Sequence, residues 1–203
     1  MFASLWAALL APAFTAFGSP TSWLELVAFV LAVWMVICNM RVNPLAWPLA
    51  FISSLLYFGF FWDGKLYGEA VLQLVFAALA VWGWWQWRFG RTREGAALTV
   101  RRLGLRGLVK PALLTLGAWP LLGLFLARVT DSPFPYWDAF PTVASLLGQW
   151  MLARKYEENW PTWIVVNVVS VVLFVLKGYW LTVILYAGFI PLSVIGWRAW
   201  RRV

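Results

Sequence analysis

The polar side chains that could bind a small molecule in this 203-residue chain lie inside long apolar stretches. Asn167 is nearly central in the apolar run 160–176, and Ser170 follows it by one helical turn on a face that includes Trp163. Unsatisfied polar atoms are costly at membrane depth, so such residues tend to mark a binding site or a pathway. Amides and hydroxyls beside an aromatic ring suit a neutral, flat, hydroxylated ligand, because the ring can stack while the polar groups donate and accept hydrogen bonds.

A matching set of residues occurs at a spacing of 113 positions. Ser54 corresponds to Asn167, Tyr57 to Ser170, and Gln73 to Tyr186. We expect the axis that relates the two sets to bring them toward one another. The candidate ligand contacts are Asn167, Gln73, Trp163, Tyr186, Trp47, Trp160, Ser54, Tyr57 and Ser170. The alternative is that a lone Asn or Gln only bonds to a neighbouring helix and holds the bundle together.

The residues needed for acid–base or metal chemistry are missing from the centres of these runs. The chain has no His and one Cys, and carboxylates such as Glu25, Glu69 and Asp138 lie toward the ends of the runs. No G-x-x-x-x-G-K-[ST] motif is present to hold phosphates. We therefore expect no enzyme, no catalytic residue, no metal and no cofactor. A carrier that works by facilitated diffusion with alternating access fits best, and a pore-forming channel is an alternative.

The elements that position these residues are seven apolar runs. With 63% hydrophobic and 12% charged residues, the chain cannot cover a water-soluble globule of this size. Each run approaches the ~20 residues that a helix needs to cross a bilayer. The runs are 23–40, 45–61, 67–87, 108–126, 136–152, 160–176 and 179–197. The sequence predicts an all-α membrane protein with seven transmembrane helices.

The chain also contains an internal repeat. Residues 23–88 overlay residues 136–201 without a gap at 13 identities, which include two Trp-Pro pairs and the motif G-W-x-x-W-R. Three helices are an odd number, so a direct copy would be inverted in the membrane unless one more helix separated the units. The run 108–126 is predicted to be that inverting linker, which gives a parallel 3+1+3 architecture.

These boundaries predict the domain organisation. The expected parts are an N-terminal interfacial segment (1–20), a first three-helix repeat (21–88), a basic cytoplasmic loop (89–107), a linker transmembrane helix (108–128) and a second three-helix repeat with a short basic tail (129–203). Residues 1–18 hold no Lys or Arg for a signal-peptide n-region, and Pro12 interrupts them. We predict a short interfacial helix there, with a spanning helix as the alternative.

The basic residues are distributed unequally between the two sides of the predicted membrane spans. Of the 16 Lys and Arg residues, thirteen fall on one side of a seven-span chain, and only Lys65, Arg128 and Lys177 fall on the other. The positive-inside rule therefore predicts a cytoplasmic C-terminus. The net charge of +8 is explained by this topology and by the anionic lipid bilayer, so no nucleic-acid partner is expected.

The two G-W-x-x-W-R motifs are predicted to end the third helix of each repeat. Their tryptophans are Trp84, Trp87, Trp197 and Trp200. We expect these rings to sit at headgroup depth beside arginines, as aromatic residues do at membrane interfaces. Gly83 and Gly196 are expected to permit close packing of neighbouring helices.

Several segments together resemble the PnuC family of vitamin transporters. They are "EENWPTWIVVN" at 157–167, "KGYWLTVILY" at 177–186, the terminal "GWRAW", and "LYGEAVLQLVF" at 66–76 followed by "GWWQW". The Trp-Pro pair at the start of the second helix of each repeat fits the same pattern. The resemblance covers residues 20–201 and rests on the order and spacing of the segments, because no single motif is decisive.

The resemblance implies a fold similar to that of the SWEET sugar transporters and nicotinamide riboside as the typical substrate. A cation–π contact to the pyridinium ring is then expected, first from Trp163, with Trp47, Trp160 and Tyr186 behind it. The resemblance also implies the bacterial inner (plasma) membrane, trapping by a cytosolic kinase, and a homo-oligomer, with a trimer as precedent. Related members are associated with thiamine or riboflavin, and a SWEET-like sugar carrier or channel is the second alternative.

Overall fold

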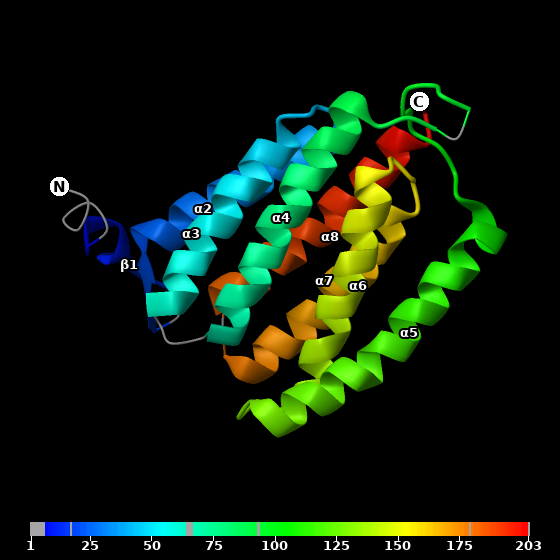
Figure 1. Ribbon diagram of the computed structural model, residues 1–203. Coiled ribbons are helices and arrows are strands. Elements are labelled where there is room, and N and C mark those ends of the chain that lie inside the picture. The colour runs from blue at the N-terminus through cyan, green and yellow to red at the C-terminus, as the bar shows by residue number, and fades with distance from the viewer. Residues whose placement is uncertain (1–6, 17, 64–66, 93, 179, 203) are drawn as a thin grey trace. The chain divides into compact units, whose positions relative to one another are not determined.

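The computed structural model describes residues 7–16, 18–63, 67–92, 94–178 and 180–202. Within these ranges the chain is predominantly helical (Figure 1). It divides into two compact units, Met1–Arg88 and Phe89–Val203.

The first unit holds α2 (Trp23–Met40), α3 (Ala46–Asp63) and α4 (Tyr67–Phe89). A capping box begins α2: the Glu25 amide N–H donates to Ser22 Oγ at 3.2 Å, and the Ser22 amide N–H donates to the Glu25 carboxylate at 2.9 Å. Two N–H groups at this helix end are thus satisfied within four residues of chain. α2 then packs alongside α3.

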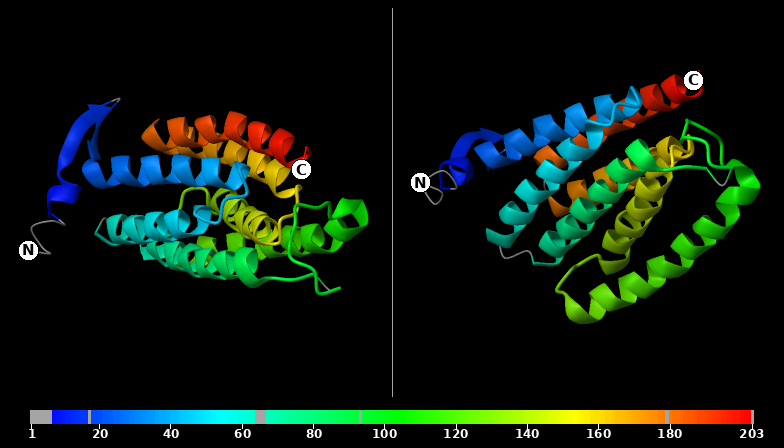
Figure 2. Two further views of the ribbon diagram at one scale, coloured as in Figure 1. Left: turned by 90° about the horizontal axis from the view of Figure 1, so that it is seen from above. Right: turned by 45° about the horizontal axis from the view of Figure 1, so that its top comes forward.

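The second unit holds α5 (Gly104–Val129), α6 (Pro135–Ala153), α7 (Asn159–Lys177) and α8 (Trp180–Trp200). Each of these helices packs against the next one in the chain, and Figure 2 shows α5 running alongside α6. The Trp119 indole N–H donates to the Tyr136 carbonyl at 2.7 Å, and the Trp119 ring meets Phe140 edge to face at 5.2 Å. The Tyr136 ring occupies the space where a side chain at Gly123 would point, so α5 approaches α6 closely there.

Within the described residues, each of the seven apolar runs coincides with a helix to within a residue or a few at its ends. Five helices in the described chain are long and apolar enough to cross a bilayer, namely α2, α4, α5, α7 and α8. The apolar stretch of α3, Ala46–Phe60, is shorter. α6 carries Asp138, Thr142, Ser145 and Gln149, which reduce its hydropathy. The chain is a multi-pass helical membrane protein, as predicted, and seven crossings stay a prediction.

The N-terminal segment differs from the prediction. Instead of an interfacial helix, β1 (Pro12–Ala16) and β2 (Ser19–Ser22) form an antiparallel hairpin, and residues 7–10 are helical. Pro12 cannot donate the bond that would continue a helix, and Gly18 adopts φ 83°, which suits a tight turn. The prediction of a helix is therefore wrong for residues 12–16, while residues 1–6 and 17 lie outside the described ranges.

The turn after the first helix of each repeat has the same backbone geometry. Val42 has φ 54° and Lys155, its counterpart at a spacing of 113, has φ 56°. Both turns close with the two bonds of a Schellman motif, a 6→1 bond of 2.9 Å and a 5→2 bond of 3.0 Å in each. Neither position is a glycine, although the left-handed region normally favours one.

Candidate polar site and tryptophan packing

A tryptophan–glycine contact joins the second and third helices of the first unit. Trp47, at the start of α3, is 2% exposed, and its ring fills the space where a side chain at Gly83 of α4 would project. One turn further along α4, the Trp87 ring meets the Trp47 ring edge to face, with centroids 5.5 Å apart and planes at 86°. Edge-to-face packing of this kind is a favoured arrangement for aromatic pairs.

The second unit repeats this contact between α7 and α8. Trp160 is 3% exposed and occupies the space beside Gly196, and it meets the Trp200 ring at 5.6 Å and 89°. The prediction of close packing at both glycines is confirmed, with an indole ring as the close neighbour. We call these two contacts the tryptophan–glycine locks. In each lock the indole N–H of the α3 or α7 tryptophan is buried without an acceptor among the described residues.

The predicted headgroup position of the motif tryptophans is wrong for two of the four and stays a prediction for the others. Trp87 is 7% exposed and Trp200 1% exposed, so both are packed inside their units and the interpretation of them as headgroup anchors is wrong. The neighbouring glycines leave room for the facing indoles, and this packing buries both rings. Trp84 is 40% exposed, and the Arg201 guanidinium lies over the Trp197 ring at 5.4 Å. The exposure of Trp84 and the cation beside Trp197 are compatible with the predicted position at the membrane interface.

The predicted polar residues of the second unit are buried in its interior. Asn167 is 2% exposed on α7, and its amide nitrogen donates to Ser193 Oγ of α8 at 3.4 Å. Ser170, one turn further along α7, is also 2% exposed. Ser193 was missed by the sequence reasoning, although it lies two helical turns after Tyr186 and therefore on a similar face of α8.

Two aromatic candidates of the second unit lie close to other residues of that unit. The Trp163 ring lies beside Gly148 of α6, where an added side chain would be tightly crowded. Tyr186 stacks on Phe174 of α7 at 5.4 Å with 12° between the planes, and it meets Phe189 edge to face at 6.2 Å. Both candidate rings are half-buried.

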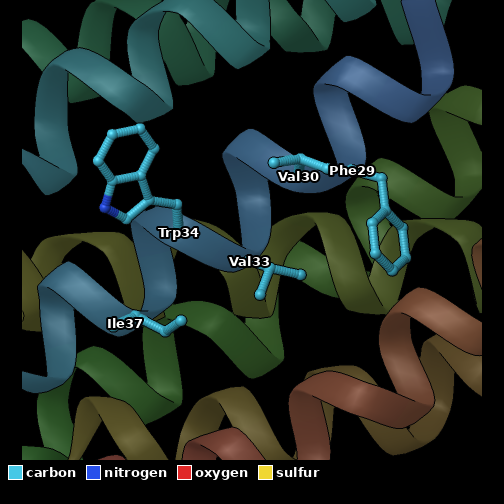
Figure 3. Close-up of a pocket in the computed structure, with 5 residues that line it drawn as sticks. All are labelled: Phe29, Val30, Val33, Trp34 and Ile37. Atoms are coloured by element: carbon cyan, nitrogen blue, oxygen red, sulfur yellow. The ribbon is translucent and has the colours of Figure 1, made fainter. Parts of the chain in front are cut away.

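The candidates of the first unit are less enclosed. Ser54 on α3 is buried, whereas Tyr57 on α3 and Gln73 on α4 are half-buried. An apolar pocket in the described chain is lined by α2 alone and includes no candidate residue (Figure 3). Its lining residues are Phe29, Val30, Val33, Trp34 and Ile37.

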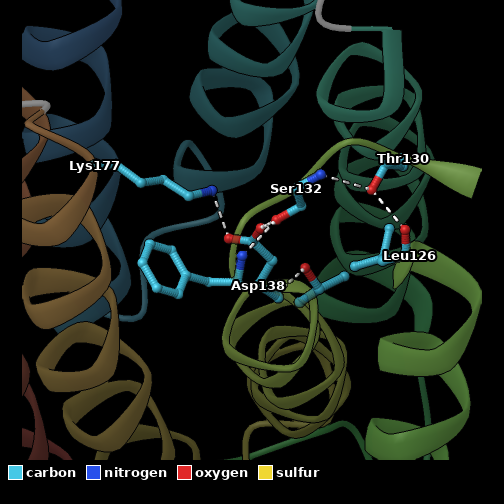
Figure 4. Close-up of polar contacts among 7 residues, drawn as sticks. Leu126, Thr130, Ser132, Asp138 and Lys177 are labelled. Atoms are coloured by element: carbon cyan, nitrogen blue, oxygen red, sulfur yellow. Dashed lines mark hydrogen bonds and ion pairs between the residues drawn. The ribbon is translucent and has the colours of Figure 1, made fainter. Parts of the chain in front are cut away.

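A charged cluster lies at the opposite end of α6 and α7 from the lock. Lys177 Nζ donates to Asp138 Oδ1 at 2.6 Å, and Ser132 Oγ donates to the other carboxylate oxygen (Figure 4). The two ionic side chains are 20% and 13% exposed. Ser132 belongs to the segment between α5 and α6, so the cluster joins that segment to the end of α7. Sequence reasoning placed Asp138 near a helix end but did not predict its partner.

The chemistry available in this arrangement is recognition through amides, hydroxyls and aromatic rings. Within the part of the chain that the structure describes, no group of three His, Cys, Asp or Glu residues could hold a metal. Buried polar side chains inside helices apolar enough to cross a bilayer are features of multi-pass membrane transporters.

The comparison with known proteins agrees with that class. The family described as nicotinamide mononucleotide transporter matches residues 22–202, so the chain belongs to this family of membrane transporters. The resemblance drawn from the sequence motifs, and the prediction of a transporter rather than an enzyme, are confirmed.

The similarity to known proteins extends over nearly the whole chain. The nicotinamide riboside transporter PnuC of Escherichia coli is 26% identical over 90% of this chain and 87% of its own length. The riboflavin/roseoflavin transporter RibM of Streptomyces davaonensis is 30% identical over 93% of this chain and 89% of its own length. The crystal structure of the vitamin B3 transporter PnuC has the same fold, with a TM-score of 0.73 at 24% identity, over 89% of this chain and 81% of that one.

Proposed function

We propose that this transporter carries nicotinamide riboside into the cell by facilitated diffusion with alternating access. The observation that carries the proposal is the family match over residues 22–202, together with the similarity to the Escherichia coli nicotinamide riboside transporter over most of both chains. Net import is sustained by phosphorylation of the riboside by a cytosolic kinase, which removes the transported form.

The positions of the carboxylates in the helices support transport that is not coupled to an ion gradient. Glu25, Asp63, Glu69 and Asp138 are the carboxylates within helices, and each is among the first four or last four residues of its helix. Asp138 is moreover paired with Lys177. A proton or sodium relay normally uses an ionisable group in the membrane interior. Purified protein in sealed vesicles should therefore equilibrate labelled substrate, and an imposed proton or sodium gradient should drive no accumulation. Reproducible uphill uptake would reject this mechanism.

The proposed topology has seven crossings in a parallel 3+1+3 order, with α5 as the inverting linker and the C-terminus in the cytoplasm. It is supported by the matching locks and Schellman turns at a spacing of 113 residues and by the sorting of basic residues. The protein lies in the bacterial inner membrane and forms a homo-oligomer, with a trimer as the expected form. A cytoplasm-dependent reporter should be active at the C-terminus and silent at Asp131; the reverse result would overturn the orientation.

The proposed substrate contacts are the polar and aromatic residues predicted from the sequence. Asn167 and Gln73 supply amides for the carboxamide and the ribose hydroxyls, and Ser54, Tyr57 and Ser170 supply hydroxyls. Trp163 is the first choice for a cation–π contact with the pyridinium ring, worth up to ~2 kcal/mol when desolvated. Tyr186 supplies a second aromatic face. Trp47 and Trp160 contribute through their indole N–H groups, which have no acceptor among the described residues, since their rings are already occupied by the locks.

Calorimetry on the purified protein tests both substrate and site. Nicotinamide riboside should bind, and Asn167→Ala, Gln73→Ala and Trp163→Ala should each weaken binding by roughly tenfold to a hundredfold, because each leaves a ligand group unpaired. Trp85→Ala, at an exposed position, is the matched control for Trp163→Ala. Unchanged affinity in folded Asn167→Ala and Gln73→Ala would reject the site.

A second candidate substrate is riboflavin. The observation in its favour is the 30% identity with RibM over 93% of this chain. Titrating riboflavin and thiamine beside nicotinamide riboside separates the candidates. If riboflavin binds tightly and the riboside does not, the family assignment stands and riboflavin replaces nicotinamide riboside as the proposed substrate.

A further inference from the structure

In the second unit, the loop before α5 and the turn before α7 are joined through their backbones. The Arg101 N–H donates to the Lys155 carbonyl at 3.0 Å, and the Glu157 N–H donates to the Arg101 carbonyl at 3.0 Å. The two bonds form a parallel bridge between Arg101 and Tyr156. A segment before α5 is therefore paired with a turn more than fifty residues later.

Glu158 adds a second connection, this time to the start of α5 itself. Its carboxylate accepts the backbone N–H groups of Leu103 at 3.0 Å and Gly104 at 2.9 Å. Leu103, the N-cap residue of α5, makes no side-chain capping bond. A carboxylate from the α6–α7 turn thus takes the role that a Ser, Thr or Asp cap has at an ordinary helix start.

Three further contacts of charged side chains join the same two segments. Glu157 pairs with Arg102 at 2.7 Å, and its side chain is only 12% exposed. Lys155 Nζ donates to the Leu98 carbonyl at 2.9 Å, and burial lowers the pKa of this ammonium group. The Arg101 guanidinium lies over the Tyr156 ring at 4.7 Å. We call the contacts of Glu157 and Glu158 with residues 102–104 the glutamate clasp.

The clasp belongs to the second repeat alone. Pro44 and Leu45 stand at the positions of the first repeat that correspond to Glu157 and Glu158. Neither can accept two backbone N–H groups or pair with an arginine through its side chain. α5 is also held by its own unit in its second half, through the Trp119 bond to Tyr136 and the close contact at Gly123.

We propose that α5 moves with α6, α7 and α8 as one four-helix body during transport, and that the glutamate clasp couples the start of α5 to this body. Contacts at the start of α5 and in its second half, around Trp119 and Gly123, hold it against its unit. The linker then functions as part of the second repeat. This assignment goes beyond the proposed substrate, because it concerns which helices move together and not what is carried.

Disulfide crosslinking tests the proposal directly. In a Cys38→Ala background, Arg101→Cys and Tyr156→Cys introduce thiols on paired backbone segments, where the ~4.8 Å spacing of such segments fits the ~4.4 to 6.8 Å that a disulfide needs between Cα atoms. We expect crosslinking to be complete and equal with and without nicotinamide riboside, and the crosslinked protein to transport as fast as the reduced protein. Loss of transport on crosslinking, restored by a reductant, would overturn the proposal.

A second cysteine pair tests the middle of α5. Gly123→Cys with Tyr136→Cys replaces the ring that now fills the space beside Gly123. The expected results are the same as for the first pair. Crosslinking that depends on substrate at either pair would contradict a single rigid body. If the reduced proteins neither bind nor transport the riboside, nicotinamide riboside is rejected as the substrate. The same crosslinking experiments with riboflavin then still test whether α5 moves with α6, α7 and α8.

Removing the clasp provides the complementary result. Glu158→Ala leaves two N–H groups at the start of α5 without their acceptor, so the Arg101→Cys and Tyr156→Cys pair should crosslink more slowly and incompletely in that background. Transport should slow while riboside affinity stays unchanged. Glu94→Ala, which removes an exposed carboxylate from the same loop, is the matched control and should change neither. A Glu158→Ala protein that crosslinks and transports like its parent would overturn the role of the clasp.

Discussion

The two repeats use the same packing at one end and different polar chemistry elsewhere. Both have a tryptophan–glycine lock with nearly equal ring geometry, 5.5 Å and 86° against 5.6 Å and 89°, and both have a left-handed residue in the turn before it. Asn167 and Ser193, which are hydrogen-bonded in the second repeat, correspond to Ser54 and Ala80 in the first. The two repeats thus share the lock, whereas their buried polar positions differ.

The ends opposite the locks also differ. Glu25 satisfies the start of its own helix in a capping box with Ser22, while its counterpart Asp138 forms an ion pair with Lys177. Gly64 stands at the position that corresponds to Lys177. One acidic position thus has a local role in the first repeat and a role between helices in the second.

The largest expected effect comes from filling the locks. Gly83→Leu or Gly196→Leu would force the facing indole out of its packed position, and overpacking of a filled interior costs about 1 to 3 kcal/mol or more. We expect both variants to lose most of their folded, monodisperse protein in size-exclusion chromatography. Gly188→Leu, at an open position on α8, is the control and should behave as wild type. A stable Gly196→Leu protein would show that the lock is not what holds α7 to α8.

The next prediction converts the second repeat toward the first. Asn167→Ser introduces the residue of the first repeat and should weaken riboside binding by about tenfold to a hundredfold, which corresponds to about 1 to 3 kcal/mol for an unpaired ligand group. Ser193→Ala should weaken it less, because Ser193 acts through the 3.4 Å bond that orients Asn167. Calorimetry checks both. Equal losses would instead indicate that Ser193 contacts the substrate itself.

The acidic positions are expected to respond unequally. Asp138→Asn leaves the Lys177 charge without its partner at a mostly enclosed position, which should cost about 1 to 3 kcal/mol and lower the apparent melting temperature in detergent. Glu25→Gln should be nearly neutral, because glutamine also completes a capping box. Asp138→Asn combined with Lys177→Gln should recover part of the loss. Similar melting shifts for Asp138→Asn and Glu25→Gln would reject the distinction.

The smallest effect concerns the left-handed turn residues, and here the sign should differ between repeats. A β-branched residue at φ 54° is strained, so Val42→Gly should raise the melting temperature, with a gain of about 1 kcal/mol or less. Lys155→Gly also relieves strain, but it removes the bond from Nζ to the Leu98 carbonyl, and we expect a net loss. Thermal unfolding of the two variants side by side measures this. Stabilisation by both would mean that the lysine contact contributes little.

The helices could be predicted from the sequence, and so could the matching positions 113 residues apart, because both depend on signals that are local or strictly periodic. Apolar runs long enough to cross a bilayer become helices wherever water is excluded, since the backbone must then satisfy its own hydrogen bonds. The observed α2, Trp23–Met40, has the predicted bounds. The exception is the hairpin formed by β1 and β2. The apolar composition of this segment is also compatible with a helix, but its proline and its glycine favour a turn.

What only the tertiary structure decided was which side chains meet. The sequence could identify the pairs of Trp and Gly at a spacing of 113, but not that Trp47 inserts beside Gly83 or that Trp200 is buried against Trp160, because these contacts join residues from different helices. The same holds for Lys177 with Asp138 and for Glu158 at the start of α5. The sequence of a single apolar membrane helix says little about which helices it packs against. Packing partners depend on the fit of side chains and on the few polar groups, and both are seen only in the packed structure.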